Sequence, residues 1–389
     1  MRYKYGEYDG QPFPTPDRLY PSAEVTRVIL QFGQRALDAM DQLEEGEGGE
    51  IVDQLLAAGL LERDPETGRL RMTPQMVRGL RHRALLQIFE RLGQGYGGGH
   101  RASLGRSRHA EREPGVRAWE FGDRLDDVDL LATLRETLAR QVEAGEPVSP
   151  LRLAGDDLMV HESQPQTKTA TCVLIDMSGS MMRAGRFYQA KRVALGLTEL
   201  IRQRYRGDTL DFVGFHSLAH VLSETDLPLA MPMPITTREP QINVAAPLAA
   251  AEAGEVDLPP HFTNLQLGLR KARQLLRKRS ADHKQLFIIT DGQPTGHVEF
   301  DRSPAQLRLI YPPTERTEML TLREAARCRQ EGLRFATFAL IEDYWGMGWV
   351  DFVDRLTRMT RGSAFYLSGD DLAEAIFESY TSGRRQRRR

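Results

Sequence analysis

Cysteine is scarce in this sequence: only Cys172 and Cys328 occur among 389 residues. Two distant cysteines cannot build a disulfide framework or supply the ligand set of a structural zinc site, so both kinds of small stabilised fold are excluded. Cys172 lies in an apolar segment and Cys328 in a segment with helical spacing. We therefore expect both to behave as small buried hydrophobic residues with inert thiols.

Long apolar runs and an excess of one charge are also lacking. No run approaches the roughly 20 apolar residues that cross a bilayer, and the first residues lack the apolar core of a secretory signal. The 52 basic and 54 acidic residues give a formal net charge of −2, so no overall field attracts nucleic acid or membrane. We expect a cytoplasmic protein.

The most informative segment that is present is an apolar strand-like run followed by three oxygen-bearing side chains. Residues 173–175 are apolar, and Asp176, Ser178 and Ser180 follow in a D-x-S-x-S pattern. A continuous apolar run predicts a strand buried on both faces, as in a parallel sheet. Ligands bind outside the carboxyl ends of such strands, so these side chains are candidates for a cation site with oxygen ligands.

Two later segments supply further oxygen ligands. A second apolar run, residues 286–289, leads to Asp291 and a turn-forming Gly292, and Thr263 lies in a loop that enters an amphipathic helix. Magnesium prefers octahedral oxygen ligands, so two serines, one threonine and two aspartates are a suitable set. Two carboxylates nearly neutralise the ion and leave it able to accept a carboxylate from outside.

These residues resemble the metal-ion-dependent adhesion site of von Willebrand factor A (VWA) domains. In that family D-x-S-x-S, a threonine and an aspartate lie on three loops at the top of a Rossmann-like sheet, and the resemblance covers about 168–382. It implies a bound Mg²⁺ or Mn²⁺. It also implies that the serines contact the metal directly, that the threonine does so when ligand is bound, and that the aspartates act directly or through water. The matching residues are Asp176, Ser178, Ser180, Thr263 and Asp291.

Each loop also has an ordinary structural explanation. Ser178 or Ser180 could cap the following helix, and Asp291-Gly292 could be a simple turn. The three loops occurring in order favour the metal site over these alternatives.

The rest of the chain predicts four parts. Residues 1–92 follow the order helix, helix, hairpin, helix, the outline of a winged-helix-like module, with Ser22 capping a helix that runs to residue 43. Residues 93–167 form a Gly- and Arg-rich linker with a helix over 126–142, and residues 383–389 are a basic tail.

For 168–382 we expect an α/β fold, a doubly wound and mostly parallel sheet. The predicted strands lie near 170–176, 209–216, 220–224, 285–290, 333–340 and 363–367. The predicted helices lie near 186–204, 264–279, 318–331, 348–361 and 370–381.

Two long connections interrupt this pattern, at 226–262 and 301–317. Loops of such length are usually functional or disordered. The first leads directly to Thr263, so we expect it to lie over the metal site. Four of its residues could form an adaptable contact surface there: Met231, Met233, Ile235 and Val244.

The layout resembles the intracellular bacterial VWA proteins that accompany AAA+ ATPases of the magnesium-chelatase and MoxR kind. The resemblance implies a protein-binding adaptor without enzymatic activity, whose metal captures an acidic side chain of a partner protein. A P-loop is absent from the sequence, so the chain is not expected to be the ATPase itself. Two alternatives remain open: a metal-dependent hydrolase, with His216 or His261 as the nearest candidate bases, and nucleic-acid binding through the first module and the basic tail.

Overall fold

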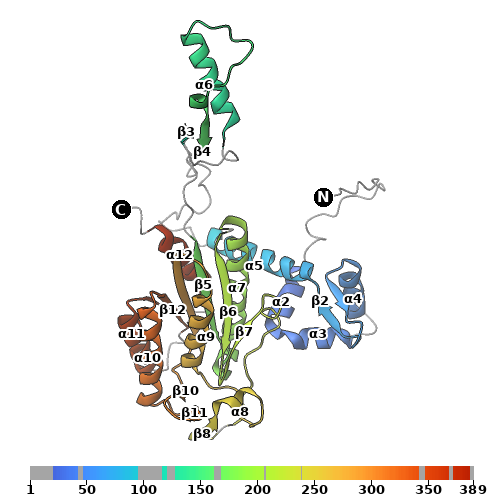
Figure 1. Cartoon of the computed structure of the whole chain (residues 1–389). Helices are drawn as coiled ribbons and strands as arrows, with labels where there is room; N and C mark the ends of the chain where they lie inside the picture. Colours follow the sequence, from blue (N-terminus) through green and yellow to red (C-terminus); the bar gives the residue numbers. More distant parts are fainter. Residues whose placement is uncertain are drawn as a thin grey trace. The chain divides into compact units, whose positions relative to one another are not determined.

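The computed structural model describes residues 21–42, 47–94, 116–120, 128–161, 168–205, 207–237, 239–340, 347–367 and 371–385. Residue contacts divide the chain into two compact units, 96–167 and the remainder (Figure 1). From residue 95 onward, the glycine-rich start of the predicted linker lies outside the described residues, as do residues 386–389 of the predicted tail.

The larger unit is built on a six-stranded sheet with the order β13-β12-β9-β5-β6-β7. All neighbouring strands are parallel except β7, which runs antiparallel to β6. The strands are β5 (Thr169–Asp176), β6 (Thr209–Phe215), β7 (Ala219–Leu222), β9 (His283–Thr290), β12 (Arg334–Leu340) and β13 (Ser363–Leu367). The predicted α/β class and strand positions are confirmed.

Helices cover both faces of this sheet because its strands are apolar on both sides. Val173 and Ile175 of β5 pack in one core with α7 (Arg186–Arg204) and α12 (Leu372–Arg385). Cys172 and Leu174 point to the other face. The helices on that face are α9 (Leu265–Arg277), α10 (Glu315–Gln330) and α11 (Met347–Thr360).

Both thiols are buried, as predicted. Burial raises the pKa of Cys328 to about 12 and that of Cys172 well above its ordinary value, so neither thiol forms a reactive thiolate.

The N-terminal region belongs to the same contact unit as the sheet. It contains α2 (Ala23–Phe32), α3 (Gln34–Asp41), α4 (Glu47–Ala57), the hairpin β1 (Leu61–Arg63) and β2 (Leu70–Met72), and α5 (Pro74–Gln94). Ser22 caps α2, since its hydroxyl accepts the Val25 N–H at 3.2 Å. Residues of α5 enter the main sheet core: Ala84, Leu85 and Ile88.

The prediction of one helix over 22–43 is wrong, because the helix breaks at Gly33. Gly33 has φ +56°, and a side chain there would place Cβ 2.3 Å from the carbonyl oxygen of Leu229. The close passage of a distant backbone segment therefore requires glycine at this position. Nothing local in the sequence announces that approach.

The two long connections were expected to be loops, but each contributes a strand to a second sheet. Its antiparallel order is β10-β11-β8, formed by β8 (Ile242–Pro247), β10 (Gly296–Glu299) and β11 (Gln306–Tyr311), with a short helix α8 (Leu248–Glu252) after β8. Val298, Leu307 and Leu309 pack with Phe262 in a small core of their own. The pairing of β8 with β11 joins segments about 60 residues apart, which short-range patterns do not reveal.

The smaller unit contains β3 (Val116–Ala118), α6 (Leu130–Glu143), a 3₁₀ turn (Gly155–Asp157) and β4 (Met159–His161). Strands β3 and β4 pair antiparallel. Asp129 caps α6 by accepting the N–H groups of Leu131 and Ala132. The predicted helix is present, whereas the strand pair was not predicted.

Within the described part of the chain, no helix is long and apolar enough to cross a membrane.

Candidate functional site

The predicted site residues lie at the carboxyl edge of the main sheet. Strands β5 and β9 are neighbours in parallel register, with Ile175 opposite Ile289. Their carboxyl ends therefore bring Asp176 and Asp291 to one edge. Thr263 lies at the same edge, on the loop that leads into α9. It immediately precedes the N-cap of that helix, Asn264, whose side chain accepts the Leu267 N–H.

Asp176 is fully buried, and both of its carboxylate oxygens accept hydrogen bonds. Oδ1 accepts the Ser178 N–H at 2.8 Å, and Oδ2 accepts the Thr290 hydroxyl at 2.6 Å. The pKa of Asp176 is raised to about 7, mainly by burial and secondly by the charge of Asp291. The two hydrogen bonds act in the opposite direction and lower the pKa. Two buried carboxylates here call for a positive charge nearby.

The two serines connect Asp176 to Asp291. Ser178 Oγ and Ser180 Oγ lie 3.0 Å apart, and the Ser180 hydroxyl donates to Asp291 Oδ1 at 2.7 Å. Ser178 occupies the N-cap position of a 3₁₀ turn (Gly179–Gly185), yet its side chain makes no capping bond. The simple capping explanation therefore does not describe Ser178, and the Asp291 carboxylate does more than form a turn.

Thr263 faces the same space from the third loop. Its N–H donates to Thr295 Oγ1 at 2.9 Å, and its carbonyl accepts the N–H groups of Thr295 and Gly296. A Cβ added at Gly292 would lie 3.9 Å from both Ser180 Oγ and Thr263 Oγ1. The two hydroxyls thus flank Gly292, and the structure brings all five predicted residues to one site.

A strap of residues 226–237 lies over the first loop, as predicted. The Met233 N–H donates to the Met177 carbonyl at 2.8 Å. Ile235 lies against Gly179, where an added Cβ would be 2.5 Å from Ile235 Cγ1. Ile235 and Met182 are both about half exposed at this rim, at 51% and 52%.

The predicted four-residue contact surface is not formed as a whole. Met233 packs against the main core. Val244 lies in β8, where it pairs with Leu309 and packs on the smaller core. Ile235 is the exposed member at the rim.

Arg186 is a site residue that the sequence analysis missed. It is the first residue of α7, is 8% exposed, and its guanidinium forms a short ion pair with Asp291 Oδ2. A positive side chain at a helix N-terminus is opposed by the helix dipole. An arginine at that position, shortly after D-x-S-x-S, was the available signal that an anion lies nearby.

The donor set suits a hard divalent cation. No group of three or more His, Cys, Asp or Glu side chains that could hold a metal occurs within the described ranges, so the ligands would be hydroxyls and two carboxylates. The 3.0 Å between Ser178 Oγ and Ser180 Oγ equals the edge of an octahedron with metal–oxygen bonds of about 2.1 Å. The residues present therefore fit Mg²⁺ or Mn²⁺.

The candidate bases are engaged by backbone groups. His216 Nδ1 lies 3.0 Å from the Pro260 carbonyl, and the Thr236 N–H approaches His261 Nδ1 at 3.4 Å. Burial lowers the pKa of His216 to about 4 and also lowers that of His261. Neither ring has a hydrogen bond to the five site residues among the contacts described.

The sheet order, the helices on both faces and the three loops at one edge define a VWA-type α/β domain. The chain belongs to a VWA family: the model described as "Rv0959-like protein, vWA domain" matches residues 169–381. A second model, "Rv0959-like protein, third domain", matches residues 111–163.

Relatives of known sequence occur in mycobacteria. Protein Rv0959 of Mycobacterium tuberculosis (strain ATCC 25618 / H37Rv) is 26% identical over 368 residues, which is 94% of this chain and 50% of that protein. Protein Mb0984 of Mycobacterium bovis matches to the same extent. The chain spans about half the length of these relatives.

Solved structures resemble the chain only distantly. The vWF domain of the type V pili tip protein Mfa5 from Porphyromonas gingivalis has a TM-score of 0.39 and 12% identity, over 57% of this chain and 97% of that one. The PilB minor pilin from Streptococcus sanguinis has a TM-score of 0.36 and 14% identity, over 59% and 64%.

Proposed function

We propose that this chain is a metal-dependent protein-binding adaptor. Ser178, Ser180 and Thr263 would hold Mg²⁺ or Mn²⁺, with Asp176 and Asp291 in support. When bound, the cation would offer a ligand position to an Asp or Glu side chain of a partner protein. The observation that carries the proposal is Ser180, which is partly exposed and whose hydroxyl joins Ser178 and Asp291.

The surroundings of the site favour a protein as the ligand. Ile235 and Met182 expose apolar surface at the rim. Such surface can pack against apolar residues around the acidic side chain of a folded partner. Membership of a VWA family is consistent with such a protein-interaction role. A partner carboxylate that is buried against the cation could anchor an interface whose specificity comes from the strap and the second sheet.

We further propose that the partner is an AAA+ ATPase of the MoxR or magnesium-chelatase kind. The support is the layout of the chain, in which a helical N-terminal region precedes the VWA domain and the sequence has no P-loop. In this scheme the ATPase performs the chemical work and the present chain connects it to a client.

The contacts described favour the adaptor over both alternatives. A hydrolase needs a base near the metal, and among the contacts described neither His216 nor His261 has a hydrogen bond to the five site residues. A DNA-reading role for α5 conflicts with its packing, since Leu85 and Ile88 lie against α7 at Gly196. Arg81 of the same helix is 7% exposed and pairs with Glu199 and Glu224.

The test combines metal binding with partner capture. Isothermal titration of Mn²⁺ into the wild type should give one site, and Ser180→Ala should weaken it strongly. Ser363→Ala removes an exposed hydroxyl at the start of β13 and should have no effect. An AAA+ ATPase recovered by affinity capture should be lost in EDTA and with Ser180→Ala. Equal recovery in every condition would end the metal-bridge proposal.

A further inference from the structure

The candidate metal site contains a positive side chain in addition to its two carboxylates, so a divalent ion would not give it a net charge of zero. Asp176 and Asp291 contribute two negative charges when both are ionised, and Arg186 contributes one positive charge against Asp291 Oδ2. With a divalent cation added, the sum is +1. Without Arg186 the sum with the cation would be zero.

Arg186 and a cation can occupy the site together because they use different oxygens of one carboxylate. The guanidinium pairs with Asp291 Oδ2, whereas Oδ1 faces Ser180 at 2.7 Å. The arginine is also fixed in place, as the first residue of α7 with a side chain only 10% exposed. Its charge therefore remains when the Ser180 side of the carboxylate is taken up by metal.

We infer that Arg186 makes binding of the cation and binding of the partner carboxylate mutually dependent. This inference rests on the proposed function. A net charge in a buried site is unfavourable, so the cation alone binds weakly beside the guanidinium. A carboxylate entering from the partner cancels the remaining +1, and by linkage each ligand then strengthens the other by the same factor.

The role proposed for Arg186 is that of a positioning residue, since it acts on the metal through Asp291 and through its own charge. Without it the metal would be neutralised by Asp176 and Asp291 alone. Such a site would hold its ion tightly and would gain little from an incoming carboxylate. With the arginine present, the site therefore binds its metal tightly only when a partner carboxylate is also bound.

The experiment is a Mn²⁺ titration of the full chain, followed by electron paramagnetic resonance, in chloride and in acetate at equal ionic strength. Acetate serves as the probe for a partner carboxylate. In the wild type, acetate should tighten Mn²⁺ binding several-fold. In Arg186→Gln, Mn²⁺ in chloride should bind about tenfold more tightly than in the wild type, since a nearby positive charge has been removed, and the acetate effect should vanish.

Two variants control for charge and folding. Arg183→Gln removes an exposed positive charge from the same loop and should behave as the wild type does. Arg186→Lys keeps the charge and should keep the acetate effect. Arg186 offsets the repulsion between two buried carboxylates. In EDTA, Arg186→Gln should therefore have a lower Tm than the wild type. On adding Mn²⁺, the Tm of Arg186→Gln should rise by more than that of the wild type.

The outcomes separate this inference from the proposed function. If no protein binds Mn²⁺, the proposed function fails and the inference fails with it. If the wild type binds Mn²⁺ but Arg186→Gln binds it equally or less tightly, with the same acetate effect, the inference alone is overturned. Weaker binding in Arg186→Gln would mean that the arginine mainly orients Asp291.

Discussion

Asp176 shows at the scale of one residue how far the sequence could predict the site. Its position after an apolar run, with Ser178 and Ser180 behind it, predicted a carboxylate at the edge of a sheet, and the structure places it there. The sequence did not reveal that Thr290 donates to its second oxygen. That contact depends on the register between β5 and β9, which no local pattern specifies.

Thr290→Val tests the support that this hydroxyl gives to Asp176. The substitution keeps the shape but leaves a buried carboxylate oxygen without its donor, so we expect a loss of about 1–3 kcal/mol in the free energy of unfolding. Urea denaturation measures it. Thr360→Val is the matched control, because the buried Thr360 hydroxyl bonds carbonyls of its own helix, those of Leu356 and Thr357. An equal loss in both variants would contradict the expectation.

Lys191 predicts a pH dependence of stability away from the site. It is fully buried in α7, donates to the carbonyls of Pro228 and Ala230, and burial lowers its pKa to about 7. Between pH 10.5 and 7 the unfolded chain therefore binds a proton that the folded chain does not bind. The free energy of unfolding therefore decreases as the pH is lowered from 10.5 to 7, by at most about 1.4 kcal/mol per pH unit. Below pH 7 the contribution of Lys191 no longer changes.

Lys191→Met removes this titration. The variant loses two hydrogen bonds at every pH, which shifts its stability by a constant amount. Its free energy of unfolding should therefore change less between pH 7 and pH 10 than that of the wild type. Urea denaturation across that range gives both slopes, and identical slopes would show that Lys191 is charged in the folded protein.

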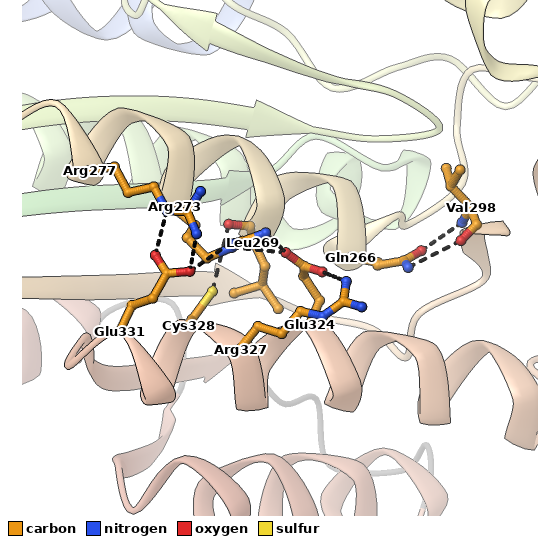
Figure 2. Close-up of polar contacts among 9 residues, drawn as sticks. All are labelled: Gln266, Leu269, Arg273, Arg277, Val298, Glu324, Arg327, Cys328 and Glu331. Carbon is orange, nitrogen blue, oxygen red and sulfur yellow. Dashed lines mark hydrogen bonds and ion pairs between the residues drawn. The ribbon is translucent and has the colours of Figure 1, made fainter. Parts of the chain in front are cut away.

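At the scale of elements, α9 and α10 are joined by a seam of ion pairs and hydrogen bonds (Figure 2). Arg273 of α9 pairs with Glu324 and Glu331 of α10. At the site end of α9, Gln266 exchanges two hydrogen bonds with the backbone of Val298 in β10. The helix that begins beside Thr263 is thus fixed along its length by both α10 and the second sheet.

Arg273→Met should be strongly destabilising because Glu324, at 1% side-chain exposure, would lose its buried partner and keep only Arg327, which is 42% exposed. We expect a loss of about 3 kcal/mol, measured by urea denaturation. The matched control is Arg277→Met. Arg277 pairs with Glu331 but is 59% exposed, so its loss should be about 1 kcal/mol or less. Equal stability of the two variants would show that the buried Arg273–Glu324 pair does not contribute more than the exposed pair.

The elements that the sequence failed to predict share one cause. Strand positions in the main sheet follow from apolar runs, whereas β8 depends on pairing with the distant β11. The break at Gly33 depends on the Leu229 carbonyl of another part of the fold. Sequence patterns describe what a segment prefers by itself, and these features are decided by what passes next to it.

At the scale of the whole molecule, α2 and α5 link the N-terminal region to the VWA sheet. They contribute Leu30, Ala84, Leu85 and Ile88 to the main sheet core, while the rest of that region packs in a core of its own. Leu85 and Ile88 of α5 lie against Gly196 of α7, where an added Cβ would be 2.6 Å from Ile88 Cδ1. The sequence predicted these regions as separate parts, at 1–92 and 168–382. The packing of α5 on α7 explains why contacts group residues 1–95 with 168–389.

Gly196→Leu should therefore loosen α5 from α7. The larger side chain cannot fit at that contact, so we expect a loss of roughly 2 kcal/mol or more in stability and faster proteolysis within residues 74–94. Gly155→Leu is the control, since nothing lies within 4 Å of a Cβ added there. Unchanged proteolysis of Gly196→Leu would mean that the two regions do not depend on each other.

The strap over the site also ties the rim to the N-terminal helices. Leu229 accepts the Gln34 N–H at the start of α3, and Met233 is fastened to Met177 beside the serine loop. The chain between these two anchors can extend to only about 14 Å. A pull on the first helices that fully extends these residues must either break the hydrogen bond to the Leu229 carbonyl or move the backbone at Met177, next to Ser178. The strap therefore links a displacement of the first helices to the serine loop.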